Sequence, residues 1–180
     1  MYGLVNIALR DLLCEEHGVD AWQQICVTAG LEDDRFLSIA SYPDALTYRL
    51  VHAAVAVLGV DQAELLRAFG RHWLLRTAQD SYSELLAAHG DDFLEFMQNL
   101  PDFHTRVQLV FPKLKPPEFT CTPLGERCLA LRYESRREGL APFLVGILEG
   151  LGQRFRKQLK IELAEARKPG THHDVFHVSW

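Results

Sequence analysis

Two sets of side chains in this sequence have types and spacing suited to holding a ligand. The first is His104, in the stretch NLPDFHTRVQLVF, where Pro101 opens a predicted short helix that leads through Val107 and Phe111 into a proline-rich segment. A neutral imidazole can offer one ring nitrogen to iron while the other nitrogen donates a hydrogen bond that fixes the ring's orientation. A lone histidine is more often a surface residue or a satisfied core residue than a ligand. The other histidines are interpreted that way: His17, His52, His72, His89, His172, His173 and His177.

The second set is Tyr133-x-Ser135-x-Arg137. In an extended chain, alternate residues lie on the same side, so a phenol, a hydroxyl and a guanidinium would point in one direction. All three groups donate hydrogen bonds, and arginine makes bidentate, charge-assisted bonds to carboxylates. The set therefore predicts a site for a ligand with paired carboxylates. The alternative is that these three side chains form a solvent-exposed strand face. That would be unusual, because Leu129 and Leu131 lie on the same face and are apolar.

The elements that must position these groups begin with helices. Over roughly the first hundred residues, apolar side chains recur at spacings of three and four, with glycines at the predicted ends. Asp61 is a predicted N-cap with Glu64 three residues later, and Ser81 with Glu84 repeats that start signal. The predicted segments are two short helices before Gly18 and Gly30, a longer one over 41–58 with Pro43 in its first turn, helices beginning at 61 and 81, and one over 92–99.

After Phe111 the pattern changes, because Pro112, Pro116 and Pro117 favour extended backbone. Residues 128–136 alternate as a strand does, residues 140–152 return to helical spacing, and residues 159–163 and 175–180 form a closing hairpin. The predicted fold class is therefore α+β, with an N-terminal helical subdomain followed by an antiparallel sheet with packed helices.

Composition limits the partners. The formal net charge is −5 and the pI is near 5.9, which argues against binding to a nucleic-acid backbone. The N-terminus lacks a basic leader and no apolar run is long enough to span a membrane, so we expect a cytoplasmic protein with no membrane partner. Cysteines 14, 26, 121 and 128 match no zinc-ligand spacing and are interpreted as reduced thiols.

Several motifs together resemble one family. They are YGLVNxAxxD at the start, AFGxxW at 68–73, NLxxxHxRVxLxFPxLxPPxF at 99–119, Tyr-x-Ser-x-Arg at 133–137 and GLAPxxxGxLxGLGxRF at 139–155. The chain resembles the haem-nitric oxide/oxygen binding (H-NOX) family, bacterial relatives of the sensor domain of soluble guanylate cyclase. The resemblance covers residues 1–180 as a single domain. It implies a helical subdomain over 1–60 and a haem-cradling α+β subdomain over 61–180, with the haem between them.

The resemblance also assigns site residues. It implies a haem b cofactor whose iron is bound by His104 and whose propionates are clamped by Tyr133, Ser135 and Arg137. It further implies that Pro117 distorts the porphyrin and that Val5 and Leu144 contact it.

Gas selectivity is predicted from the hydrogen-bond donors opposite His104. A donor stabilises bound oxygen, which carries negative charge, more than it stabilises nitric oxide. Oxygen-binding members of the family have a tyrosine where this chain has Phe143, beside Leu144, and neither side chain donates. Trp73 is the exception, because its indole N–H is a donor and similar sequences place a tryptophan there. We expect stable ferrous complexes with nitric oxide and carbon monoxide, and none with oxygen.

The family also implies an output. Nitric oxide should weaken the bond between iron and His104, release the helix around it, and let the porphyrin relax against Val5 and Pro117. Because no catalytic domain follows Trp180, the expected receiver is a separate protein, either a histidine kinase or a cyclic-di-GMP enzyme, and the chain itself is not expected to be an enzyme.

Four alternatives remain open at this point. A peroxidase-like haem enzyme would need an acid–base group opposite His104. An oxygen-binding haem sensor would need a hydrogen-bond donor there. A cysteine nucleophile at Cys121 or Cys128 has no evident histidine or carboxylate partner in the sequence. A structural or adaptor domain without cofactor would have little use for His104 and the Tyr-x-Ser-x-Arg set.

Overall fold

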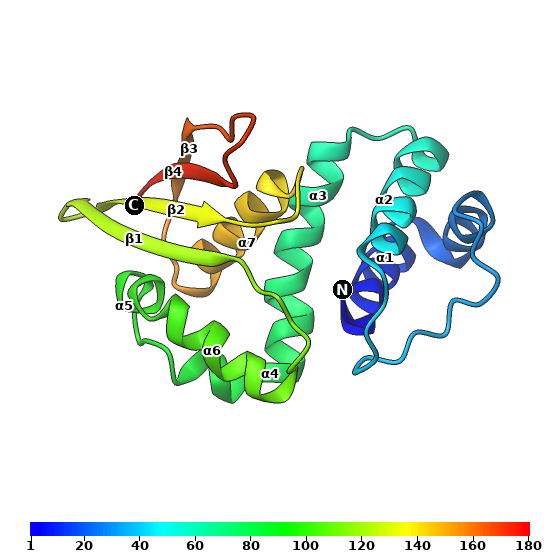
Figure 1. Ribbon diagram of the computed structural model, residues 1–180, viewed down its shortest axis with the longest axis horizontal. Coiled ribbons are helices and arrows are strands. Elements are labelled where there is room, and N and C mark those ends of the chain that lie inside the picture. The colour runs from blue at the N-terminus through cyan, green and yellow to red at the C-terminus, as the bar shows by residue number, and fades with distance from the viewer.

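A computed structural model describes residues 1–180, and it confirms the predicted α+β class (Figure 1). Helices occupy the first part of the chain, and a four-stranded antiparallel sheet with one inserted helix follows. The helical elements are α1 (Gly3–Thr28), α2 (Asp44–Leu58), α3 (Gln62–His72), the π-helical segment η1 (Trp73–Ala78), α4 (Gln79–Ala87), α5 (Phe93–Gln98), α6 (Leu100–Val110) and α7 (Ala141–Arg154); the strands are β1 (Glu118–Gly125), β2 (Cys128–Glu134), β3 (Lys160–Glu165) and β4 (His173–Ser179).

Local signals explain most of the helix ends. The two predicted N-terminal helices are both present within α1 and meet at a kink at Gly18, whose φ of 86° favours a residue without a side chain. Helix α2 starts at Asp44 rather than at 41, because Pro43 keeps an extended ψ of 135° and precedes the first turn. Asp61 caps α3 as predicted, since its carboxylate accepts from the N–H groups of Ala63 and Glu64.

The predicted helix start at Ser81 falls one residue before a kink. Two helices meet within α4 at Tyr82, which has the non-helical values φ −142° and ψ 29°. The first of them continues from α3 through η1. The Ser81 side chain does not cap the second, and Leu74 and Ala78 before the kink and Leu86 after it are buried.

The sheet has the strand order β1-β2-β4-β3, and all neighbours are antiparallel. The central strand β2 buries Leu129, Leu131 and Tyr133 on one face, as the alternation predicts. It ends at Glu134, slightly before the predicted end, although the Ser135 N–H still donates to the His172 carbonyl at 2.8 Å. Tyr133 is thus the second-to-last residue of β2, and Ser135 and Arg137 lie just beyond the end of the strand.

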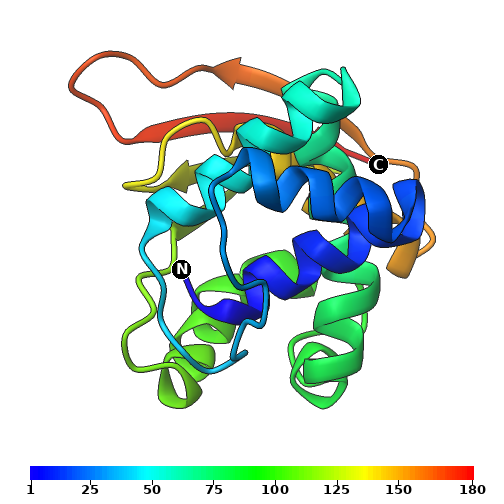
Figure 2. The ribbon, with the colours of Figure 1, turned by 90° about the vertical axis from the view of Figure 1, so that its right-hand side faces the viewer.

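Two groups of buried side chains form separate cores. The first joins α1 and α2 to the first part of α3, and the second joins η1, α5 and α7 to the sheet. Figure 1 shows α1 and α2 at one end of the molecule and the sheet at the other, with α3 running between them. Figure 2, turned by 90°, shows the N-terminus between the sheet and the green helices α4–α6. None of the helices combines the length and the apolar character needed to cross a lipid bilayer.

Candidate functional site

A large apolar cavity lies where the two cores meet. Its volume is about 640 Å³, within the usual range of ligand sites, and 25 of its 35 lining residues are hydrophobic. Helices α1 and α2 line it from the N-terminal side, and α3, η1, α6, α7 and the sheet line it from the other. The nine residues singled out in the sequence all reach this one cavity: Val5, Trp73, His104, Pro117, Tyr133, Ser135, Arg137, Phe143 and Leu144.

His104 projects from α6, which starts with Leu100 and Pro101. Its Nδ1 lies 3.1 Å from the carbonyl oxygen of Leu100, one turn earlier, so the neutral ring donates from Nδ1 and keeps a free lone pair on Nε2. The ring stacks on Phe119 with centroids 5.4 Å apart and meets the edge of Phe103 at 5.6 Å. Burial lowers the pKa of His104, which favours the neutral, metal-binding form.

Haem is the metal group that suits this arrangement. The structure contains no cluster of three or more His, Cys, Asp or Glu side chains that could hold an ion. A metal bound at His104 must therefore bring most of its other ligands with it, as haem iron does with the four porphyrin nitrogens. The apolar walls suit a macrocycle, and the donors of Tyr133, Ser135 and Arg137 suit its two carboxylates.

Contacts within the protein position the donors of Tyr133, Ser135 and Arg137. The Ser135 hydroxyl oxygen accepts from the Arg137 N–H at 3.1 Å, which turns the chain just after β2. Burial raises the pKa of Tyr133, and the hydrogen bond to Ser135 and the charge of Arg137 offset part of that rise. The phenol therefore remains protonated at neutral pH and can donate a hydrogen bond.

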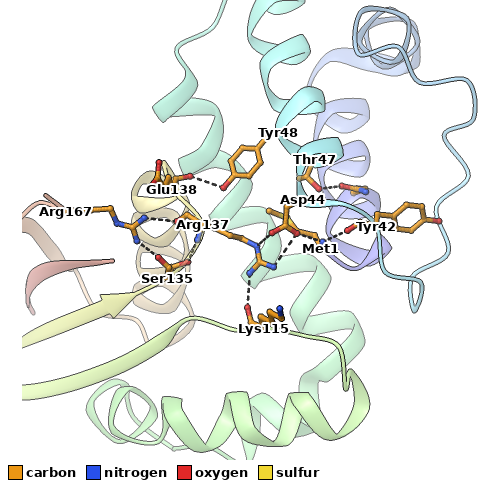
Figure 3. Close-up of polar contacts among 11 residues, drawn as sticks. Met1, Tyr42, Asp44, Thr47, Tyr48, Lys115, Ser135, Arg137, Glu138 and Arg167 are labelled. Atoms are coloured by element: carbon orange, nitrogen blue, oxygen red, sulfur yellow. Dashed lines mark hydrogen bonds and ion pairs between the residues drawn. The ribbon is translucent and has the colours of Figure 1, made fainter. Parts of the chain in front are cut away.

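Arg137 also connects the two halves of the molecule (Figure 3). Its Nε donates to Asp44 Oδ2 on α2 at 2.8 Å, and its Nη1 donates to the Lys115 carbonyl at 2.9 Å. The α-amino group of Met1 donates to the other Asp44 oxygen, at 2.5 Å. Burial alone would raise the pKa of Asp44, but these two cations more than offset it and hold that pKa below its ordinary value. The sequence analysis missed Asp44, which lies 93 positions from Arg137 and carries no local motif.

The α3–α7 side of the cavity combines apolar and aromatic groups. Phe143 and Leu144 come from α7, and the Phe143 ring packs on Phe69 of α3 with centroids 5.0 Å apart. Trp73 opens the π-helical segment, a rare structure that is often found at functional sites. This wall offers one indole N–H and otherwise no polar group among these residues.

Three tyrosines that the sequence analysis did not select also line the cavity. The Tyr48 hydroxyl donates to the Glu138 carbonyl at 2.9 Å, and the Tyr2 hydroxyl oxygen accepts from the Lys113 N–H at 3.0 Å. The Tyr82 hydroxyl makes no such bond, and burial raises its pKa, so it remains a proton donor. A kink within a helix, as at Tyr82, is not signalled by apolar spacing.

Comparisons with known proteins agree with this geometry. The family model described as "Haem-NO-binding" matches residues 2–163. Among curated proteins, the chain is 28% identical over 166 residues to soluble guanylate cyclase gcy-31 of Caenorhabditis elegans and 29% identical over 179 residues to gcy-35 of the same animal. These alignments cover 92% and 98% of the chain but only 24% and 26% of the two cyclases, so the chain spans about a quarter of their length.

Solved structures share the fold. An H-NOX protein from S. oneidensis, in its Fe(II)NO state, superposes with a TM-score of 0.89 at 22% identity, covering 99% of this chain and 98% of that one. The unliganded Fe(II) H-NOX protein from K. algicida gives a TM-score of 0.88 at 23% identity, covering 99% and 96%.

Proposed function

The chain belongs to the haem-NO-binding (H-NOX) family, and on that premise we propose that it binds haem b through His104 and senses nitric oxide. At the family level it is a haem-binding gas-sensor domain, like the sensor of soluble guanylate cyclase. One observation carries the finer proposal. A single apolar cavity joins an anchored neutral imidazole to a set of three carboxylate-binding donors.

The protein's own residues would hold the cofactor at two points. His104 would bind the iron with Nε2, because Nδ1 is occupied by the Leu100 carbonyl. Tyr133, Ser135 and Arg137 would bind the propionates, and Val5, Pro117 and Leu144 would contact the ring. The haem supplies an iron atom at which a diatomic gas can coordinate.

The wall of the cavity supports selectivity for nitric oxide and carbon monoxide. Phe143 and Leu144 carry no hydrogen-bond donor, so neither could stabilise the negative charge that oxygen acquires on binding. The same lack of an acid–base group at these positions disfavours a peroxidase-like reaction. Oxygen sensing is the second candidate, because Trp73 and Tyr82 carry donors and line the same cavity.

For the output, we propose that His104 would tether α6 to the bound cofactor, and that nitric oxide binding to the cofactor would weaken this bond and release α6. We also propose that the helical part, residues 1–60, then shifts relative to residues 61–180 and that a separate protein reads the shift. Such a ligand changes a conformational equilibrium only through its different affinities for the two states, and a bond present in only one of them provides that difference. A histidine kinase or a cyclic-di-GMP enzyme is the receiver we favour.

The test is an absorption spectrum of the ferrous protein alone, with nitric oxide and in air. We expect haem to be bound, a nitric oxide complex without histidine coordination, and no stable oxygen complex. His104→Gly should lose the protein's bond to the iron, and added imidazole should restore coordination. Iron coordination that is unchanged in this variant without imidazole would refute the assignment of His104, and a persistent oxygen spectrum would favour the second candidate.

A further inference from the structure

Arg167 lies behind the Tyr-x-Ser-x-Arg set, in the loop that joins β3 to β4. Its Nη2 donates to the Ser135 carbonyl at 2.6 Å, and its Nη1 donates to the Arg137 carbonyl at 3.2 Å (Figure 3). Nη2 also donates to the His172 carbonyl at 2.9 Å. One guanidinium therefore binds the backbone carbonyls of Ser135 and Arg137, two of the three residues in the set. The Tyr-x-Ser-x-Arg motif does not predict this contact.

The geometry explains why arginine suits this place. The carbonyls of Ser135 and Arg137 both accept from Arg167 at the bend after β2, and the planar fork of a guanidinium can reach two acceptors at once. The loop is itself fixed, because the Arg167 N–H donates at 2.8 Å to the buried carboxylate of Asp174, which pairs with Tyr133 across the sheet. Each member of the set is thus connected to this one loop.

A further observation separates Arg167 from an ordinary surface arginine. Its Nε is buried and has no hydrogen-bond partner, and leaving a buried donor unpaired is costly. The guanidinium therefore binds three carbonyl oxygens through Nη1 and Nη2 while its Nε–H has no acceptor. Its charge also acts on the site, since it offsets part of the burial-driven rise in the pKa of Tyr133.

We propose that Arg167 is a positioning residue for carboxylate binding: it sets the backbone of Ser135 and Arg137 so that their donors converge on the propionates, and it adds a second positive charge behind them. This inference rests on the proposed haem-binding function. Arg167 itself does not line the cavity, so its effect must pass through the Tyr-x-Ser-x-Arg set.

The test measures haem release from the full chain to an excess of haem-free myoglobin. Two variants separate geometry from charge: Arg167→Gln removes both, and Arg167→Lys keeps the charge but loses the fork. Lys168→Gln is the matched control, because it removes one exposed charge from the same loop. Each protein is loaded either with haem or with haem dimethyl ester, whose blocked carboxyls have no negative charge for the set to bind.

We expect Arg167→Gln to speed haem release about tenfold, in line with the loss of charge-assisted hydrogen bonds, and Arg167→Lys to have an intermediate effect. With the dimethyl ester, the three variants and the unmodified chain should release at rates within about twofold of one another. An equal acceleration for both porphyrins would show that Arg167 only stabilises the hairpin and would overturn the proposal, as would an unchanged rate with haem. If the unmodified chain takes up no haem at all, the proposed function fails instead.

Discussion

On the proposed function, hydrogen-bond donors at the cavity wall would determine which gas is stabilised, and Phe143, which lines this wall, carries none. Its ring packs on Phe69 of α3, so its position is set by the contact between two helices. A phenol at residue 143 would add a donor to that wall without removing the packing of the ring.

We therefore expect Phe143→Tyr to create a stable ferrous oxygen complex, with oxygen dissociation slowed at least tenfold, because one charge-assisted hydrogen bond is worth about 1.5–3 kcal/mol. Stopped-flow dissociation after mixing with an oxygen scavenger measures this. Phe143→Leu, which also changes the packing but adds no donor, should behave like the unmodified chain. A tyrosine variant with the same spectrum in air as the parent would show that residue 143 does not face the gas.

The thiols can be tested directly. Burial raises the pKa of Cys26 to about 11, so at pH 8 only about one thiol in a thousand is a thiolate, the form that reacts. Alkylation of Cys26 by iodoacetamide at pH 8 should be at least tenfold slower in the folded chain than in urea, as followed by peptide mass spectrometry. Equal rates in both conditions would mean that the helix around Cys26 opens readily.

Residues that belong to a local pattern could be predicted from the sequence, and residues that act across the fold could not. His104 stands out by its proline-rich context, and Tyr133 to Arg137 by alternate spacing within a strand. Asp44 and Arg167 bind the same segment from elements 93 and 30 positions away from Arg137. Their roles depend on how α2 and the closing hairpin pack, which periodicity does not encode.

At the scale of elements, the crossing of α3 and α7 supports the cavity wall. A side chain at Gly146 would overlap the Arg67 carbonyl, and one at Gly70 would overlap the Phe143 carbonyl, so each helix has a glycine where the other passes. The close approach also lets Glu149 of α7 bind Arg67 and Arg71 of α3.

Gly146→Ala should lower the free energy of unfolding by about 2–4 kcal/mol, because backbone rather than a flexible side chain must move to make room. Urea denaturation followed by circular dichroism measures this loss. Gly125→Ala is the matched control: nothing lies near its added methyl, and its effect should stay within about 0.5 kcal/mol. A neutral Gly146→Ala would mean that the two helices are less closely packed than the structure shows.

Glu149 gives this crossing a pH dependence. Burial alone would raise its pKa, but Arg67 and Arg71 more than offset that, so the folded pKa lies below the ordinary 4.5. The stabilisation is therefore complete above about pH 5 and is lost as the pH falls through the folded pKa. Glu149→Gln should cost about 1 kcal/mol at pH 7, since both arginines are partly exposed, and the difference from the parent should shrink toward pH 3. A constant difference over this range would rule out the ion pairs as its source.

The elements themselves were predictable where one strong local signal acted alone. Asp61 capped α3, and alternation at Leu129 and Leu131 marked the central strand. Ser81 with Glu84 indicated a helix start one residue before the kink at Tyr82, although the Ser81 side chain does not cap the helix that follows. The π-helical segment that begins at Trp73 follows Phe69 of the first core and contains Leu74 of the second, and apolar spacing did not predict it.

For the whole molecule, the cavity lies where the two cores meet, and contacts around it link residues 1–60 to the rest of the chain. Polar links between residues 1–60 and the rest include Asp44 to Arg137, Tyr48 to the Glu138 carbonyl and Tyr2 to the Lys113 N–H. The packing of α3 against α1 and α2 adds an apolar contact between these parts. If the proposed output is a shift between these parts, the links determine how freely it occurs.

Asp44→Asn should therefore loosen the orientation of the two parts even without haem, because it replaces an ion pair with a weaker amide contact. Spin labels at two exposed positions, Val27 on the N-terminal side and Leu163 on β3, report the distance between the parts, after the native cysteines are replaced by serine. We expect a single narrow distance distribution for the parent. The width of the distribution for Asp44→Asn should be at least about 1.5 times that of the parent. Asp33→Asn, which breaks an exposed ion pair with Arg35 inside the N-terminal part, should leave the distribution unchanged. If Asp44→Asn is as narrow as its parent, the ion pair does not restrain the two parts, and the coupling must pass through α3 alone.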